Sequence, residues 1–338
     1  MCPNFSKSVP FFDEITRLAD GYAGSRILQC AVGLGVFETI ENGNRTASEV
    51  ARDIRTEVRA TAIFLDALTA LGLLTKEGRD YGLSPLSRTY LLPSSPRYFG
   101  GMIVFDGRLW DLWGRLEEAI RSGSPVRRTE MFQQDEAETG RFIGAMDGIV
   151  RARGDADYLS AQLDLRQVST LLDIGSGPGT YPIAFCKAYP DLKVTIFDLP
   201  GTLDVTRRYI EKAGLEGRIR WVAGDYNRDP IPGGHDLVFL SNVIHGEDEA
   251  HNRALMKKIH ASLKPGGEVI IKDHILDETM TQPAAGAVFS LMMLMTNAGR
   301  DYGLHEVRAW LEEAGFHGVR ETVLPSPMTS SLVRAVKP

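Results

Sequence analysis

Apolar positions in the first hundred residues follow the period of an α-helix and then that of short strands. Thr46 and Glu49 form the pattern of a helix N-cap with its return carboxylate, and Gly72 stands where a later helix would end. The expected elements are one or two helices over 11–39, a helix from Thr46 to about Ile54, a helix over 58–71, and hairpin strands at 73–75 and 81–83. This order predicts a winged helix.

The second half of the chain alternates short apolar runs with longer amphipathic segments. Strands are expected at 170–174, 193–197, 218–223, 236–240 and 267–272, and helices at 180–189, 201–213 and 249–263. Such alternation predicts a parallel sheet with crossover helices. Strands at 319–324 and 331–336 would add an antiparallel pair at its edge. The predicted fold class is α/β, with a winged helix preceding a Rossmann-like domain that has a mostly parallel seven-stranded sheet.

Length and pattern together divide the chain into three parts. With 338 residues it exceeds the usual size of a single hydrophobic core. We expect a winged-helix-like dimerisation domain over 1–100, a helical bridge over 101–162, and a ligand-binding domain over 163–338.

Charge and cysteine content narrow the class of partner. The net charge is −6, and residues 1–100 hold eleven Lys or Arg against eleven Asp or Glu. This balance disfavours phosphate binding, so packing against another subunit is the preferred role of the winged helix, with DNA binding as the alternative. No nucleic-acid or membrane partner is expected, because the longest apolar stretch, 284–295, is too short to span a bilayer. Three widely spaced cysteines and the lack of a signal segment predict a cytoplasmic protein.

A glycine-rich turn follows the strand that ends in Asp173. It reads Gly175-x-Gly177-x-Gly179, and such a strand-to-helix turn lets backbone N–H groups approach a ligand closely. Asp198 ends the next strand, at the separation at which a carboxylate accepts both hydroxyls of an adenosine ribose. The turn alone fits a dinucleotide, S-adenosylmethionine, or a structural role without ligand.

Charge favours S-adenosylmethionine among these ligands. A pyrophosphate is an anion, whereas the methionine end of S-adenosylmethionine carries an ammonium and a sulfonium, which suit the carboxylate of Asp173. The turn also lacks the G-x-G-x-x-G spacing of dinucleotide sites. A methyltransferase is therefore preferred over a nucleotide-dependent oxidoreductase.

Other polar residues follow the later strands, where ligands of open parallel sheets bind. Asp225 is placed to accept from the adenine amino group while Tyr226 covers the ring, although a solvated turn acid is the alternative for Asp225. His245 ends an apolar run, and Asp273 follows the fifth strand. Asp301 lies in a glycine-containing loop before the next helix.

His245 is the candidate general base, because its ordinary pKa of about 6.5 suits proton removal near neutral pH. A sulfonium is already a good leaving group, so such an enzyme mainly aligns a nucleophile and takes its proton. Asp273 or Asp301 is expected to hold the far ring nitrogen. The alternative for an isolated histidine is a structural role.

Metal binding is the less favoured alternative. Asp273 and His274 are neighbours on one strand and would point to opposite faces, His274 off the sheet, so they would not ligate one ion together with His245. No metal is expected.

The chain resembles the plant-type small-molecule O-methyltransferases, which include caffeate and acetylserotonin methyltransferases and bacterial natural-product enzymes. The likeness spans nearly the whole chain. The motifs that carry it are Ala31-Val-Gly-Leu-Gly-Val-Phe37, Leu171 to Gly179, Phe197-Asp198-Leu199-Pro200, Gly224-Asp225, Asn242-Val-Ile-His245, Leu263-Lys-Pro-Gly-Gly267 and Ala314-Gly-Phe316.

The resemblance implies a homodimer formed through the N-terminal domain, S-adenosylmethionine as cofactor and a small-molecule acceptor. It makes His245 the general base and puts Asp273 and Asp301 where the family usually has two glutamates. The implied cofactor-binding residues are Asp173, Gly175, Gly177, Asp198, Leu199, Asp225, Tyr226 and Ser241. The implied acceptor pocket, to which the bridge contributes, is lined by Phe142, Met146, Met292 and Met295, whose helical spacing equally fits core packing.

Two positions depart from the family pattern. Gly246 follows His245 where the family often continues His-Asp-Trp, and Ser241 stands where a lysine is often found. Some relatives methylate carbon or nitrogen, and others bind S-adenosylmethionine for another reaction. The intact His245 with two nearby carboxylates favours oxygen methylation among these options. A NAD-dependent oxidoreductase and a winged-helix regulator are the more distant alternatives.

Overall fold

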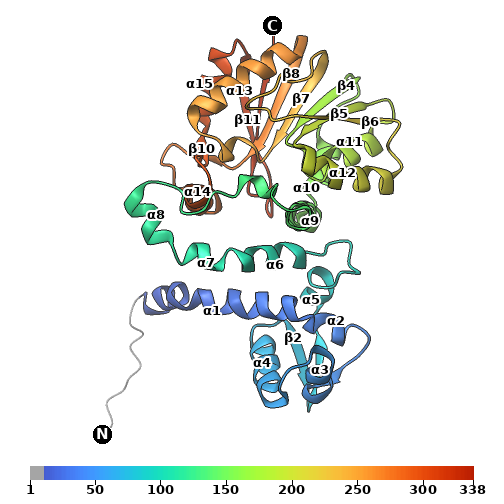
Figure 1. Cartoon of the computed structure of the whole chain (residues 1–338), viewed down its shortest axis with the longest axis vertical. Helices are drawn as coiled ribbons and strands as arrows, with labels where there is room; N and C mark the ends of the chain where they lie inside the picture. Colours follow the sequence, from blue (N-terminus) through green and yellow to red (C-terminus); the bar gives the residue numbers. More distant parts are fainter. Residues whose placement is uncertain (1–10) are drawn as a thin grey trace. The chain divides into compact units, whose positions relative to one another are not determined.

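The computed structural model describes residues 11–338, and the chain divides into two compact units between Arg108 and Leu109 (Figure 1). This single division does not test the separate role predicted for residues 101–162. The three-part organisation therefore stays a prediction.

The first unit has the winged-helix order that the sequence predicts. Its elements are α1 (Phe12–Leu34), α2 (Val36–Ile40), β1 (Arg45–Thr46), α3 (Ala47–Ile54), α4 (Val58–Ala70), β2 (Leu74–Glu77), β3 (Asp80–Leu83), α5 (Pro85–Tyr90) and α6 (Gly100–Arg108). Gly35 adopts φ 74° and separates α1 from α2. The Thr46 and Glu49 side chains form the predicted capping box of α3. The two-residue strand β1, which the sequence analysis missed, pairs with β3 of the hairpin.

Helix α1 leaves large apolar side chains exposed near its start. Phe12, Leu18 and Tyr22 are 59%, 80% and 64% exposed, and the opposite end of the helix is buried in the core of the unit at Ala31 and Val32. A row of exposed aromatic and aliphatic side chains on one helix is typical of a protein interface.

The second unit begins with helices and continues as alternating strands and helices. Its elements are α7 (Trp110–Trp113), α8 (Leu116–Ser122), η1 (Glu130–Phe132), α9 (Glu136–Arg153), α10 (Asp155–Gln162), β4 (Thr170–Ile174), α11 (Thr180–Ala188), β5 (Lys193–Asp198), α12 (Pro200–Ala213), β6 (Ile219–Ala223), β7 (His235–Ser241), η2 (Ile244–Gly246), α13 (Glu249–Ser262), β8 (Leu263–Asp273), β9 (Ile275–Leu276), α14 (Ala284–Thr296), β10 (Tyr302–Gly303), α15 (Leu304–Glu313), β11 (His317–Val323) and β12 (Ser331–Val336).

The predicted seven-stranded sheet is confirmed. Its strand order is β11-β12-β8-β7-β4-β5-β6. The strands β8, β7, β4, β5 and β6 are all parallel. Strand β12 runs antiparallel to both β8 and β11. The order reverses direction between β4 and β7, and ligands of open α/β sheets bind at the carboxyl ends beside such a point.

Two buried clusters hold the sheet, one on each face. Along β8, Ile270 belongs to the cluster with α10, α11 and α12, whereas Val269 and Ile271 belong to the cluster with α13 and α15. Side chains alternate in the same way along β4, β5 and β7. Figure 1 shows the two sets of helices on opposite faces of the sheet.

Strand β8 starts earlier than predicted. We expected a helix stop at Lys264-Pro265-Gly266 and a strand from Gly267, but β8 begins at Leu263, which pairs with His235. Gly266 N donates to Lys337 O, and Lys337 N donates to Gly267 O. Pairing with the far end of the chain therefore extends the strand through a segment that its local sequence marks as a turn.

The remaining global predictions concern cysteines and membranes. Cys30 and Cys186 are unbridged, and Cys2 lies outside the described residues. Over residues 11–338, no helix combines the length and apolar character needed to cross a bilayer.

Candidate active site

Four strand ends of the sheet carry the predicted polar residues side by side. Asp198, Asp173, Ser241 and Asp273 end or nearly end β5, β4, β7 and β8, which are neighbours in that order. Alternation along the strands sends Asp173 and Asp198 to the face of α11 and α12, because Ile174 and Phe197 belong to the opposite cluster. Asp273 points to the other face. The structure therefore brings the predicted cofactor residues and the predicted base to one edge.

The glycine-rich turn after β4 depends on its glycines. Gly175, Gly177 and Gly179 have backbone φ angles of 66°, 56° and 74°, which residues with a Cβ atom rarely adopt. A Cβ on Gly175 would lie 2.9 Å from Val243 Cγ2 and 4.0 Å from the Tyr226 ring. The turn is therefore packed against the segment after β7, and the N–H groups of its three glycines donate to Phe197 O, Asp198 Oδ2 and Ser176 O.

Asp198 joins the two neighbouring strand ends. Its Oδ2 accepts from Gly177 N at 2.8 Å, and its Oδ1 accepts from Leu199 N at 2.7 Å. Burial raises the pKa of Asp198 to about 6, against the lowering effect of these hydrogen bonds. The Thr202 side chain also hydrogen-bonds to this carboxylate, which leaves one further acceptor position. The predicted contact with ribose hydroxyls stays a prediction.

Asp173 is a buried acid without a full set of partners. It is 1% exposed, and among the described residues its Oδ2 has no hydrogen bond of good geometry, although the Ser176 side chain is a hydrogen-bonding neighbour of the carboxylate. Burial, together with the charge of Asp198, raises the pKa of Asp173 to about 8. An unpaired buried carboxylate oxygen is costly unless a ligand cation or donor meets it. The site thus fits the ammonium-bearing end of S-adenosylmethionine better than a pyrophosphate.

The other predicted cofactor residues have local partners. Asp225 accepts from Asn227 N at 2.9 Å and lies 3.4 Å from Arg228, which is the solvated-turn arrangement. The Tyr226 hydroxyl donates to Glu247 at 2.9 Å, and its ring packs against the sheet core. Leu199 precedes α12 as its N-cap residue. Ser241 Oγ is buried, with the Tyr181 side chain as its hydrogen-bonding neighbour. None of these contacts tests cofactor binding.

His245 lies in the short 3-10 helix η2 and forms a hydrogen-bonded pair with Asp273. His245 Nδ1 and Asp273 Oδ1 are 2.7 Å apart, and the imidazole side chain is 14% exposed while Asp273 is fully buried. Burial alone would lower the pKa of His245, but the charge and hydrogen bond of Asp273, with the charge of Asp301, raise it above its ordinary value. Asp273, rather than Asp301, is therefore the direct partner.

His274 differs from the expectation that it points off the sheet. Strand β8 ends at Asp273, so strand alternation no longer applies to the next residue. His274 Nδ1 lies 3.3 Å from Asp301 Oδ2, and His274 Nε2 lies 2.9 Å from Thr329 Oγ1. His274, which was not among the predicted site residues, therefore lies beside Asp273 and Asp301.

Ligand atoms of His245, Asp273 and Asp301 all lie within 4.8 Å of one another. One nitrogen of His245 and one oxygen of Asp273 are hydrogen-bonded to each other. That no metal takes part stays a prediction.

Phe289 on α14 is a site residue that the sequence analysis missed. Its ring meets the His245 imidazole edge to face, with centroids 5.0 Å apart, and the His274 imidazole in the same manner at 5.5 Å. An apolar ring against both imidazoles fixes their planes and keeps water from one side. The only sequence signal was the single aromatic residue in the apolar stretch 284–295.

The predicted acceptor-pocket residues differ in burial. Phe142 and Met146 on α9 and Met292 on α14 are partly buried, and Phe142 packs on Phe132 with centroids 4.7 Å apart. Met295 is fully buried, and this burial fits the core-packing alternative. Lining of an acceptor pocket by these four residues stays a prediction.

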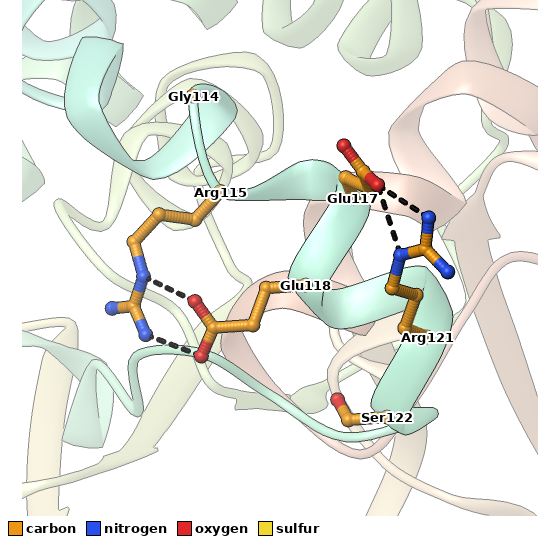
Figure 2. A pocket seen from close by; sticks show the side chains of 6 residues that line it. All are labelled: Gly114, Arg115, Glu117, Glu118, Arg121 and Ser122. Carbon is orange, nitrogen blue, oxygen red and sulfur yellow. Dashed lines mark hydrogen bonds and ion pairs between the residues drawn. The ribbon is translucent and has the colours of Figure 1, made fainter.

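A separate hollow lies on the surface of α8 and contains none of the predicted site residues. Figure 2 shows its lining, in which Arg115 pairs with Glu118 and Arg121 pairs with Glu117. Exposed pairs between residues one turn apart contribute little and leave no group unsatisfied. This hollow is not a candidate for the chemistry.

Gly299 supports the loop that carries His245. A Cβ at this position would lie 2.2 Å from His245 O and 2.6 Å from Glu247 O, which are backbone atoms. We therefore expect Gly299→Ala to displace His245, the predicted base, and to lower kcat about 10- to 100-fold, with a smaller effect on donor affinity. Steady-state kinetics and calorimetry measure the two.

Gly217→Ala is the matched control, because nothing lies within 4 Å of a Cβ there. Equal kcat values for the two variants would show that the close approach of Gly299 does not position His245.

Comparisons with known proteins identify the family of the chain. Residues 115–317 match the model of the O-methyltransferase domain, and residues 16–93 match that of the O-methyltransferase dimerisation domain. The chain is 33% identical over 326 residues to the 3-hydroxy-5-methyl-1-naphthoate 3-O-methyltransferase of Streptomyces sahachiroi, covering 96% of this chain and 94% of that protein. It is 29% identical to the N,N-dimethyltransferase OxyT of Streptomyces rimosus, covering 96% of each.

A solved structure shows the same architecture with the methyl donor present. The complex of human N-acetylserotonin methyltransferase with S-adenosylmethionine superimposes with a TM-score of 0.89 at 26% identity, covering 98% of this chain and 99% of that chain. The chain belongs to the O-methyltransferase family and is an S-adenosylmethionine-dependent methyltransferase.

Proposed function

We propose that this enzyme transfers a methyl group to a hydroxyl of a small, flat, largely apolar molecule, with His245 as general base. The observation that carries the proposal is the 2.7 Å pair of His245 and Asp273 at the same sheet edge as the glycine-rich turn. The named substrate of the Streptomyces sahachiroi relative, a hydroxynaphthoate, supports an aromatic hydroxyl as acceptor.

The protein's contribution to the reaction is alignment and proton removal. When bound, S-adenosylmethionine supplies an electrophilic methyl group. His245 uses the ring nitrogen that does not face Asp273 to take the acceptor's hydroxyl proton. Asp273 keeps the other nitrogen protonated, holds the ring plane, and stabilises the imidazolium that forms. Phenols, with ordinary pKa values near 10, need this proton removed.

The cofactor assignment within this proposal uses the strand ends. Asp173 would meet the donor's ammonium with its unpaired oxygen, and Asp198 would meet the ribose hydroxyls. Gly175 and Gly177 would allow the backbone to approach, with Tyr226 beside the turn. Leu199, Asp225 and Ser241 complete the proposed set.

Nitrogen methylation is the second candidate function. It is favoured by the likeness to OxyT, whose name states N,N-dimethyl transfer. An amine acceptor would present the same proton to His245, so the geometry of the base does not separate the two.

Two further parts of the proposal concern assembly and location. The exposed Leu18 and Tyr22 on α1, within the dimerisation-domain match, and the exposed Phe12 just before it support a homodimer that covers them. The cytoplasmic location predicted from the cysteines and the absence of nucleic-acid and membrane partners remain parts of the proposal.

The pH dependence of turnover follows from the environment of His245. Because the pKa of His245 is raised above 6.5, the imidazole is protonated and unable to accept a proton below that raised value. We expect kcat at saturating donor and acceptor to rise with pH, with a midpoint above 6.5. Acceptors of different acidity provide the control, and a midpoint that follows the acceptor's own pKa would contradict the assignment.

The test of the function is mass spectrometry of reactions with methyl-labelled donor and a panel of phenols, enols, amines and carbon acids. The proposal predicts label on oxygen of at least one phenol. Label found only on nitrogen or only on carbon would contradict the proposal and indicate an N- or a C-methyltransferase instead.

A further inference from the structure

The His245 and Asp273 pair has a neighbour of the same kind. His274 Nδ1 lies 3.3 Å from Asp301 Oδ2, and His274 Nε2 lies 2.9 Å from Thr329 Oγ1. The Asp301 side chain is fully buried, and its carboxylate oxygens have no hydrogen bond of good geometry among the described residues. His274 is thus the imidazole that faces Asp301, in the way that His245 faces Asp273.

The two pairs are in contact. His274 N donates to Asp273 Oδ1 at 2.9 Å, the same oxygen that His245 Nδ1 contacts at 2.7 Å. Phe289 lies edge to face against both imidazoles. The carboxylates of Asp273 and Asp301 share the 4.8 Å cluster with His245. A change in charge at one pair is therefore felt at the other through short distances in a dry environment.

Two carboxylates so close together both stay ionised only where neighbouring groups favour their ionised forms. His245 Nδ1 meets Asp273 directly, and the corresponding nitrogen for Asp301 is His274 Nδ1. Asp301 in turn acts on His245, because its negative charge favours the imidazolium that forms when the base accepts a proton.

We propose that His274 is a positioning residue that keeps the Asp301 carboxylate ionised beside His245 and so makes His245 a stronger proton acceptor. This inference rests on the proposed role of His245 as general base. It assigns the second imidazole a function through Asp301 and no contact with donor or acceptor.

The charged groups around the cluster are few. Strand β8 contributes Asp273 and the buried Lys272, and the loop before β10 contributes Asp301. Arg153 of α9 lies 3.5 Å from Thr329 Oγ1, so Thr329 stands between Arg153 and His274. Helix α14, which packs on both imidazoles through Phe289, carries no charged residue. Lys272 opposes a proton on His245, so the favourable field there comes from the two carboxylates.

The test compares the pH dependence of kcat for the wild type, His274→Phe, Asp301→Asn and the double variant. His274→Phe keeps an aromatic ring beside Phe289 and removes both nitrogens. Asp301 should then bind a proton, and the acidic limb of the profile should move to lower pH by about half a unit to one unit. Asp301→Asn should give a similar movement, and the double variant should move no further than either single one.

A merely structural role for His274 predicts a different pattern. It would lower kcat equally at all pH values and leave the limb in place. Two results would overturn the proposal. In the first, the midpoint of the acidic limb shifts in Asp301→Asn but not in His274→Phe. In the second, the shift in the double variant equals the sum of the two single shifts.

Two further variants keep the test decisive. Thr329→Val removes the partner of His274 Nε2 with little change in shape. It should shift the acidic limb in the same direction by a smaller amount, and it provides the test where His274→Phe does not fold. His251→Phe changes an exposed histidine that pairs with Asp248 at 2.8 Å and should leave the limb unchanged.

Failure of the base assignment itself is recognised separately. In that case His245→Ala would keep wild-type turnover, whereas failure of the present inference leaves His245→Ala inactive and the limb of His274→Phe unmoved.

Discussion

Replacing His245 with alanine is expected to lower kcat about 10²-fold or more while leaving the affinity for S-adenosylhomocysteine unchanged. The imidazole is held by Asp273 on the face of the sheet opposite to Asp173 and Asp198, so its loss removes proton transfer and spares the donor's contacts. Single-turnover kinetics with saturating donor measures the first quantity, and titration calorimetry measures the second.

His251→Ala is the matched control for that variant. His251 also pairs with an aspartate, Asp248, but its side chain is 54% exposed and lies on α13. Its replacement should leave kcat within about twofold, as is usual for exposed positions. If His245→Ala and His251→Ala have the same kcat, His245 is not the base.

Replacing Asp198 with alanine is expected to weaken S-adenosylhomocysteine binding about 10- to 100-fold, the loss of one or two hydrogen bonds to a charged group. Two effects add here. The donor loses its proposed ribose acceptor, and the glycine-rich turn loses the bond from Gly177 N to Asp198 Oδ2 that ties it to β5. Calorimetry gives the affinity, and thermal unfolding shows whether the fold is retained.

Asp198→Asn and Asp204→Ala separate these effects. The amide keeps one acceptor oxygen and should retain part of the affinity. Asp204 lies on α12, is 61% exposed and pairs loosely with Arg207 at 3.6 Å, so its removal should change neither quantity. Wild-type affinity in folded Asp198→Ala would remove the ribose assignment.

The sheet was predictable because its signals are local. Strand β4 has the predicted bounds, and β5, β6 and β7 differ from prediction by a residue or so. Each is a continuous apolar run that ends in a polar residue, and a helix with a clear stop follows most of them. The start of β8 was wrong because pairing with His235 and Lys337 overrides the local turn signal of Lys264-Pro265-Gly266.

The candidate site was predictable only as far as strand ends determine it. His245 and Asp273 follow adjacent strands, so their meeting is a consequence of topology. The choice between Asp273 and Asp301, the turn of His274 toward Asp301, and the contact of Phe289 depend on how β9, α14 and the loop before β10 fold back over the sheet edge. No spacing of residues in the sequence predicts how these segments pack against the sheet edge.

The most direct test of the account is a crystal structure of the protein with S-adenosylhomocysteine and a phenol that it methylates. We predict the donor product across the carboxyl ends of β4 and β5, with its amino group at Asp173 and the phenol oxygen about 3 Å from a nitrogen of His245. A phosphate-bearing cofactor in that place, or a phenol oxygen beyond the reach of His245, would contradict it.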